Sequence, residues 1–312
     1  MNRVAVLMGG MSGEREVSLR SGAAVSRALR EKGYEALEVD VGEDVVEVVA
    51  GLRGRADAAF VALHGRLGED GTVQGLLELV GIPYTGSGVL ASAISMSKST
   101  TKGILGAAAV PVVDGAVISV REVASLGLES VCEGLALDLG FPLMVKPDCE
   151  GSSLGASRVR DREELAAGIS CALEYDDLLV VERYVEGREM TVGLVGEEPL
   201  ALPVLEVVAS KGVYDYECKY TRGKTEYIVP APISGGLARE LERLSLRAFN
   251  ALGCEGISRV DFMVDEEERP YCLEINTIPG MTELSLIPKA AAAAGYSFGD
   301  VVEMVLRTAR LK

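Results

Sequence analysis

Residues 273–288, LEINTIPGMTELSLIP, open as a short apolar strand that carries Glu274 and Asn276. The strand then breaks at Pro279-Gly280, a pair of residues typical of turns. Side chains two positions apart lie on the same face of a strand. The two polar groups therefore share a face just ahead of the break, which raises the question of what lies opposite them.

The partner strand is predicted just upstream, in residues 257–264 (ISRVDFMV), where apolar and polar residues alternate. The acidic segment DEEERP joins the two strands, which is the pattern of a β-hairpin. With the turn centred on that segment, Asp261 lies opposite Glu274. The same register sets Arg259 opposite Asn276, so all four polar side chains lie on one face.

Asp261, Glu274 and Asn276 form a set of oxygen donors that contains no thiol or imidazole. Such donors suit Mg²⁺, which keeps several waters and shares ligands with nucleotide phosphates. A solvated polar face of the hairpin is the alternative. The apolar neighbours Leu273 and Ile275 make the strand look buried, and buried carboxylates need partners, so a metal site is favoured.

The composition limits the classes of partner. The chain has 312 residues, enough for two or three domains, and a formal net charge of −16. Nucleic acids and acidic membranes require a basic face, so both are unexpected partners, whereas focused cations can still hold a small anion. Six cysteines without a C-x-x-C pair, and His64 as the single histidine, provide no zinc-type ligand set. We expect a soluble, cytoplasmic protein.

The first part of the chain alternates between predicted strands and helices. Strands are expected near 3–8, 35–41 and 58–63, and helices near 18–32, 44–53 and 72–80. This alternation is typical of a parallel, doubly wound α/β sheet. Later elements are expected as helices at 89–108, 236–252 and 298–310, and as strands near 141–146 and 178–182.

Several further segments carry groups suited to ligand binding. KPDCEGSSLG (146–155) follows a strand, and its small residues let backbone amides approach a phosphate; a plain turn is the alternative. GGMSGEREVSLRSG (9–22) and HGRLGEDGTVQG (64–75) begin where strands end, which is where open α/β sheets bind ligands. YDYECKYTRGKTEY (214–227) combines aromatic and charged residues, as both functional loops and mobile surface loops do.

Taken in order, these motifs resemble those of the D-alanine–D-alanine ligases of the ATP-grasp family, almost from end to end. The resemblance implies an α/β ATP-grasp fold of three α/β domains, with ATP held between the central and C-terminal domain sheets. It also implies cytoplasmic action on peptidoglycan precursors, commonly as a homodimer. The first implied part is an N-terminal doubly wound domain on the first-substrate side, at 1–87. A central ATP-grasp subdomain follows at 88–180. The C-terminal ATP-grasp subdomain, at 181–312, carries the metal site and a mobile lid at 211–226.

The resemblance also implies nucleotide and metal contacts. The residues that match ATP-binding positions are Lys98, Lys146, Glu182, Arg183, Val185, Glu189 and Lys219. Among them, Glu182 matches a carboxylate for adenine, Glu189 one for ribose, and Lys219 a phosphate-side lysine on the lid. Asp261, Glu274 and Asn276 match the ligands of two Mg²⁺ ions, for which Mn²⁺ can substitute.

A third set of implied roles concerns the amino-acid substrates. The matching residues are Glu14, His64, Ser152, Tyr220, Arg259, Gly280, Ser285 and Leu286. Glu14 matches the partner of the first D-alanine ammonium, in a triad with Ser152 and Tyr220, and His64 matches a nearby histidine. Arg259 and the Gly280 backbone match donors around the tetrahedral intermediate. Ser285 and the Leu286 backbone match binders of the second D-alanine carboxylate.

The implied reaction is the ATP-dependent ligation of two D-alanines through a D-alanyl phosphate, with release of ADP and phosphate, for peptidoglycan precursor synthesis. Tyr220 fits a dipeptide-forming enzyme, because related depsipeptide ligases can carry phenylalanine at the matching position. A related ATP-grasp ligase that uses D-lactate or D-serine as acceptor is the nearest alternative. A non-catalytic nucleotide-binding regulator is a further one, but the presence of Arg259 and the three metal-ligand candidates argues against it.

Overall fold

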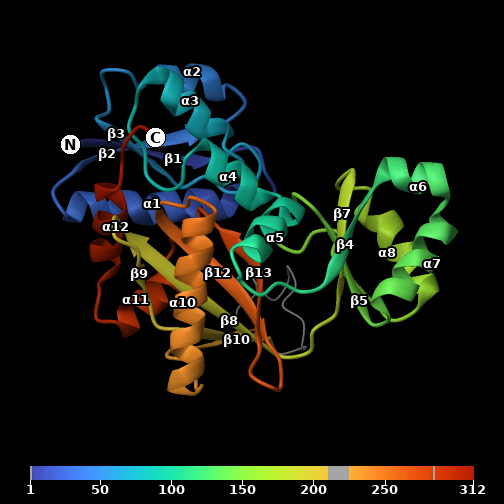
Figure 1. Cartoon of the computed structure of the whole chain (residues 1–312). Helices are drawn as coiled ribbons and strands as arrows, with labels where there is room; N and C mark the ends of the chain where they lie inside the picture. Colours follow the sequence, from blue (N-terminus) through green and yellow to red (C-terminus); the bar gives the residue numbers. More distant parts are fainter. Residues whose placement is uncertain (1, 210–224, 284) are drawn as a thin grey trace.

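The computed structural model describes residues 2–209, 225–283 and 285–312, whose strands form three separate β-sheets (Figure 1). In Figure 1 the central sheet and its helices stand to one side, and the other two sheets lie one above the other. The predicted lid at 211–226 falls outside the described residues except for Thr225 and Glu226, which begin β11. No helix within the described ranges is both long and apolar enough to cross a membrane.

The N-terminal sheet has the strand order β2-β1-β3, and both pairings are parallel, as the sequence predicted. Its strands are β1 (Arg3–Gly9), β2 (Glu35–Val41) and β3 (Ala58–Val61). The helices that follow these strands are α1 (Arg15–Glu31), α2 (Val45–Ala50) and α3 (Thr72–Val80). Strand β1 is almost wholly apolar because helices cover both faces of the sheet, with α1 on one face and α2 and α3 on the other (Figure 1).

Residues 89–108 form two helices, whereas the sequence predicted a single helix there. They are α4 (Val89–Met96) and α5 (Lys98–Ala107). The single-helix prediction was wrong because Ser97 adopts an extended backbone and its side chain accepts a hydrogen bond from the Thr100 N–H, which caps α5. The break makes Lys98 the first residue of α5.

The central sheet has the strand order β4-β7-β5-β6 with antiparallel neighbours. Its strands are β4 (Gly115–Ser119), β5 (Leu143–Pro147), β6 (Ser157–Val159) and β7 (Leu178–Arg183). Its helices are α6 (Val120–Leu126), α7 (Leu128–Leu139) and α8 (Arg162–Ala172). Helices α7 and α8 bury apolar side chains against one face, which leaves the other face available to a ligand.

The third sheet has the order β11-β10-β8-β12-β13, with β9 also paired to β8, and all these pairings are antiparallel. Its strands are β8 (Arg188–Gly196), β9 (Leu200–Ala201), β10 (Leu205–Ala209), β11 (Thr225–Ile228), β12 (Gly256–Val264) and β13 (Pro270–Asn276). The predicted hairpin register is confirmed, since Asp261 pairs with Glu274 and Arg259 with Asn276. Helix α10 (Gly235–Ala251) covers the back of this sheet.

The last two helices connect the third sheet to the first. They are α11 (Leu286–Ala293) and α12 (Phe298–Arg307). One apolar core contains Val4 of β1, Val25 of α1, Val195 of β8 and Val301 of α12. The N-terminal sheet and the C-terminal helices therefore bury their apolar faces together, although they lie at opposite ends of the chain.

The core behind the third sheet should determine how rigidly its front face is held. Leu241 of α10 is fully buried there, so Leu241→Ala should lower the free energy of unfolding by roughly 2–5 kcal/mol. The matched control is Leu137→Ala on α7, where the leucine is 76% exposed and the change should stay within about 0.5 kcal/mol. Denaturant titration followed by circular dichroism measures both, and equal losses in the two variants would contradict this account.

Candidate functional site

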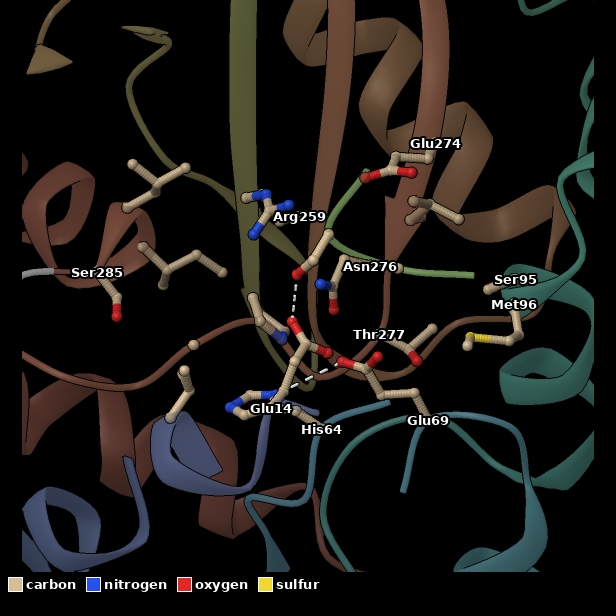
Figure 2. A pocket seen from close by; sticks show the side chains of 18 of the residues that line it. Glu14, His64, Glu69, Ser95, Met96, Arg259, Glu274, Asn276, Thr277 and Ser285 are labelled. Carbon is tan, nitrogen blue, oxygen red and sulfur yellow. Dashed lines mark hydrogen bonds and ion pairs between the residues drawn. The ribbon is translucent and has the colours of Figure 1, made fainter. Parts of the chain in front are cut away.

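Two adjoining cavities lie between the sheets. The smaller cavity, of about 420 Å³, is lined by residues of β5 and β7 in the central sheet and of β8, β10, β12 and β13 in the third sheet. The larger cavity, of about 760 Å³, adds residues of the N-terminal segment (Figure 2). The residues that line both cavities are Lys98, Glu150, Arg259, Leu273, Glu274 and Leu286. A ligand in one cavity can therefore meet a ligand in the other at this shared wall.

Glu14 and Ser152 meet on one wall of the larger cavity. The Ser152 hydroxyl donates a hydrogen bond of 2.5 Å to Glu14 Oε1 across 138 positions of sequence. Glu14 precedes α1, whereas Ser152 lies in the loop after β5, where its φ of 52° is left-handed. The structure thus brings two members of the predicted triad together, while Tyr220 and also Lys219 lie outside the described residues.

His64 is buried beside Glu14, with 6% of its surface exposed. Its Nδ1 lies 3.5 Å from Glu69 Oε1 and its Nε2 lies 3.4 Å from the Ser21 hydroxyl. Burial alone would lower the pKa of His64, but the Glu69 and Glu14 carboxylates outweigh it and raise the pKa. Glu69 was not among the predicted site residues, although its place five positions after the single histidine was a signal for it. Figure 2 shows Glu14, His64 and Glu69 together on one side of the cavity.

The hairpin face carries the predicted polar cluster. The Arg259 guanidinium donates to both oxygens of Asp261, with Nε–Oδ1 at 2.9 Å and Nη2–Oδ2 at 2.7 Å. The Thr191 hydroxyl donates a further hydrogen bond of 2.6 Å to Asp261 Oδ1. The Asn276 side-chain oxygen accepts from the Ile278 N–H at 2.9 Å. These contacts hold the cluster on the cavity side of the sheet, where Figure 2 shows Arg259 and Asn276 near one another.

A β-bulge in this hairpin changes the direction of one side chain. The register shifts between Asp261 and Phe262, so the regular alternation of β13 is interrupted at Leu273. Leu273 looked like a core residue in the sequence, but it is only half-buried and lines both cavities next to Glu274. Cys272 and Ile275 are the buried core residues of this strand. The bulge thus gives the site an apolar group beside a carboxylate.

The predicted metal ligands fit Mg²⁺ by their donor chemistry. Asp261 and Glu274 are direct partners across the two strands, and Asn276 lies two positions farther along the same face. Asp261 already accepts four contacts from Arg259 and Thr191, as many as the about four lone-pair sites of a carboxylate, so a metal ion there would replace or share one of them. Across the described ranges, no group of three or more His, Cys, Asp or Glu side chains is arranged for a metal. The candidate site therefore depends on two carboxylates and an amide oxygen.

Glu182 and two lysines form a buried charge cluster at the smaller cavity. Lys146 Nζ donates to Glu182 Oε2 at 2.6 Å, and Lys102 Nζ is bonded to the other oxygen. Burial disfavours the ionised carboxyl group, but the two ammonium groups outweigh it and lower the pKa of Glu182. Burial also disfavours the charged form of both lysines, whereas the Glu182 carboxylate favours it. The effect of Glu182 is larger at Lys146, whose pKa is raised, and the effect of burial is larger at Lys102, whose pKa is lowered. Lys102 was not predicted, because its role is visible only once Glu182 is known to be buried.

The remaining predicted nucleotide contacts surround the same cavity. Arg183 ends β7, and Tyr184 and Val185 follow it; all three line the smaller cavity, as does Glu189 of β8. The Arg158 guanidinium lies 3.9 Å from the centre of the Tyr184 ring. The apolar residues of this cavity include Met144, Leu154, Val207, Met263 and Leu273. A cavity that combines apolar walls with charged groups suits a planar heterocycle attached to a polar chain.

Lys98 lies at the shared wall, where its Nζ donates to the Glu150 carbonyl oxygen at 2.6 Å. Gly280 and Ser285 lie close together on another wall of the larger cavity. A Cβ at position 280 would be 3.1 Å from the Ser285 hydroxyl, so glycine permits this approach. Leu286 begins α11 and lines both cavities. Every predicted site residue within the described ranges therefore borders one of the two cavities.

Comparison with known proteins agrees with this arrangement. A family model described as the D-ala D-ala ligase C-terminus matches residues 104–307, and one described as the D-ala D-ala ligase N-terminus matches residues 46–87. A D-alanine–D-alanine ligase of Syntrophotalea carbinolica is 49% identical over 310 residues, which cover 99% of this chain and 97% of that protein.

Solved structures show the same similarity. A D-alanine–D-alanine ligase from Bacillus anthracis complexed with ATP aligns with a TM-score of 0.82 and 33% identity, covering 99% of this chain and 96% of that chain. VanG D-Ala:D-Ser ligase from Enterococcus faecalis aligns with a TM-score of 0.86 and 28% identity, covering 98% of this chain and 99% of that chain. The chain has the α/β ATP-grasp fold and belongs to the D-alanine–D-alanine ligase family.

Proposed function

We propose that this protein ligates two D-alanine molecules into D-alanyl-D-alanine, using ATP and releasing ADP and phosphate. The observation that carries the proposal is the shared wall of the two cavities, where Lys98, Arg259 and Glu274 face both. The relatives named D-alanine–D-alanine ligase support the same substrates. Because the reaction consumes ATP to make a peptidoglycan precursor, we propose that it takes place in the cytoplasm.

In this proposal the larger cavity binds the first D-alanine. The Glu14 carboxylate pairs with the substrate ammonium, and the hydrogen bond from Ser152 fixes its orientation. The substrate carboxylate then points toward the shared wall. It attacks the γ-phosphorus of ATP to form a D-alanyl phosphate, which brings two anions together. Lys98 and Lys146 reduce this repulsion because both line the cavity that would hold ATP.

The second step joins the acceptor to the activated carbonyl group. The amine of the second D-alanine attacks the acyl carbon and displaces phosphate, while Arg259 and the Gly280 N–H stabilise the negative oxygen that develops. Ser285 and Leu286 border the same cavity and are proposed to bind the acceptor carboxylate. Identity to the Syntrophotalea carbinolica D-alanine–D-alanine ligase exceeds identity to the D-Ala:D-Ser ligase, which favours D-alanine as acceptor.

We propose that Asp261, Glu274 and Asn276 hold two Mg²⁺ ions, which Mn²⁺ can replace. Bound there, the ions would neutralise phosphate charge. The Arg259 guanidinium donates hydrogen bonds to Asp261, so it is oriented by the same carboxylate that would bind the metal. The predicted division at 1–87, 88–180 and 181–312 remains part of the proposal, with ATP between the last two parts.

We also propose that the chain forms a homodimer. Leu79 of α3 and Leu90 of α4 are 83% and 72% exposed, on two helices that contact one another. Exposed apolar surface of this kind is typical of a face covered by a partner. A second copy of the chain is the occupant that the family resemblance implies.

The direct test measures ADP release from Mg·ATP with D-alanine, with L-alanine, and with D-alanine plus D-lactate or D-serine, and identifies products by mass. ADP release that depends on D-alanine and yields D-alanyl-D-alanine is expected. Release only with D-lactate or D-serine would keep the fold and change the acceptor. ATP binding without turnover for any acceptor would favour a regulator.

Removing the charge of Glu14 should affect the first D-alanine selectively. Glu14→Gln keeps an oxygen that accepts from Ser152 but cannot pair with an ammonium, so the KM for D-alanine at the first site should rise about 10- to 100-fold. The KM for ATP should be nearly unchanged. Glu16→Gln, at an exposed position in the first turn of α1, is the matched control and should leave both constants unchanged. Steady-state kinetics measure these values, and equal effects of the two changes would contradict the assignment.

Metal removal should abolish ADP release, and Mg²⁺ or Mn²⁺ should restore it. Glu274→Gln weakens the proposed donor set, so the Mg²⁺ concentration for half-maximal rate should rise at least about tenfold. Glu267→Gln in the exposed turn of the same hairpin should leave that concentration unchanged. A Glu274→Gln enzyme with the wild-type metal requirement would remove Glu274 from the site.

A further inference from the structure

Glu182 is bonded to two lysines, of which only one reaches a cavity. Lys146 and Glu182 are both among the described residues that line the smaller cavity, whereas Lys102 lines neither cavity. The second lysine instead lies behind the cavity wall, where its Nζ is bonded to Glu182 and also donates to the Val113 carbonyl oxygen at 2.7 Å. A buried cation outside the ligand cavity therefore needs an explanation beyond direct ligand contact.

The charges of the cluster of Glu182, Lys102 and Lys146 suggest an explanation for the second lysine. Glu182 and Lys146 alone would form a neutral pair, and a neutral pair offers little net attraction to an anionic ligand. With Lys102 included, two ammonium groups share one carboxylate and the cluster has a charge of +1. The exposed fractions of the side chains are 4% for Glu182, 14% for Lys102 and 19% for Lys146, so water screens these charges weakly.

We propose that Lys102 is a positioning residue that neutralises Glu182, so that the positive charge of Lys146 remains available to the phosphates of a bound nucleotide. This inference rests on the proposed use of ATP. It accounts for the position of Lys102 one helical turn after Lys98, since residues four apart lie on the same side of α5. The same helix thus supplies one lysine to the cavity and a second to the carboxylate behind it.

A purely mechanical role is the competing explanation. Lys102 connects α5 to Glu182 on β7 and to the segment before β4, and such a connection could simply hold the elements together. The two explanations differ when the charge of Glu182 is removed as well. Lys102→Met leaves a net charge of 0, whereas Lys102→Met with Glu182→Gln returns it to +1 without restoring the connection.

The experiment compares the dissociation constants of ADP and adenosine, by calorimetry and by ligand-detected NMR, at a fixed Mg²⁺ concentration. The ratio of the adenosine constant to the ADP constant reports the contribution of the phosphates and is insensitive to changes around adenine. Lys102→Met should reduce this ratio about tenfold. Lys102→Met/Glu182→Gln should return it close to the wild-type value, and Lys102→Arg should keep it there. Thermal melting confirms that each variant is folded.

A Lys102→Met ratio equal to that of the wild type would overturn the inference while leaving the proposed function intact. A reduced ratio that the double variant does not restore would also overturn it, in favour of the mechanical connection. Wild-type protein that binds no ADP would instead overturn the proposed function, and this inference with it.

Discussion

Hydrogen bonds between β12 and β13 align Asp261 with Glu274 and Arg259 with Asn276, and this alignment determines which face carries the chemistry. A slip of one residue would turn these polar side chains toward the core behind the sheet and bring Phe262 and Ile275 to the cavity. Burial of those apolar residues against α10 therefore stabilises the functional register as well as the fold. The cavities, the candidate metal ligands and the arginine all depend on this pairing.

Among the described residues that line the two cavities, cations balance carboxylates, although the chain as a whole has a formal net charge of −16. The cations of the site lie against acceptors, as Arg259 does against Asp261 and Lys98 against the Glu150 carbonyl oxygen. Such pairing partly offsets the cost of desolvating charged groups in a partly buried cavity. A nucleotide would therefore meet charges whose positions are already fixed, which reduces the reorganisation needed when it binds.

Local patterns were sufficient to predict the parallel N-terminal sheet and the register of the hairpin, because alternation and a short turn determine both. The interrupted helix at Ser97 and the bulge at Leu273 were missed, since each depends on a single side chain or an extra residue. Helix α6 has seven residues, of which none is buried, so its apolar pattern is too short to mark a helix. The contact between Glu14 and Ser152 could be predicted from the family resemblance alone, because two residues 138 positions apart leave no local signal in the sequence.

The core shared by β1, α1, β8 and α12 has a consequence for how the chain folds during synthesis. Val4 leaves the ribosome almost 300 residues before Val301, yet both are fully buried in the same core. Until α12 is made, the side of α1 that packs on α12 stays an uncovered apolar surface, which exposes a nascent chain to aggregation and to chaperones. The N-terminal segment is therefore expected to reach its final packing only late, when the end of the chain arrives.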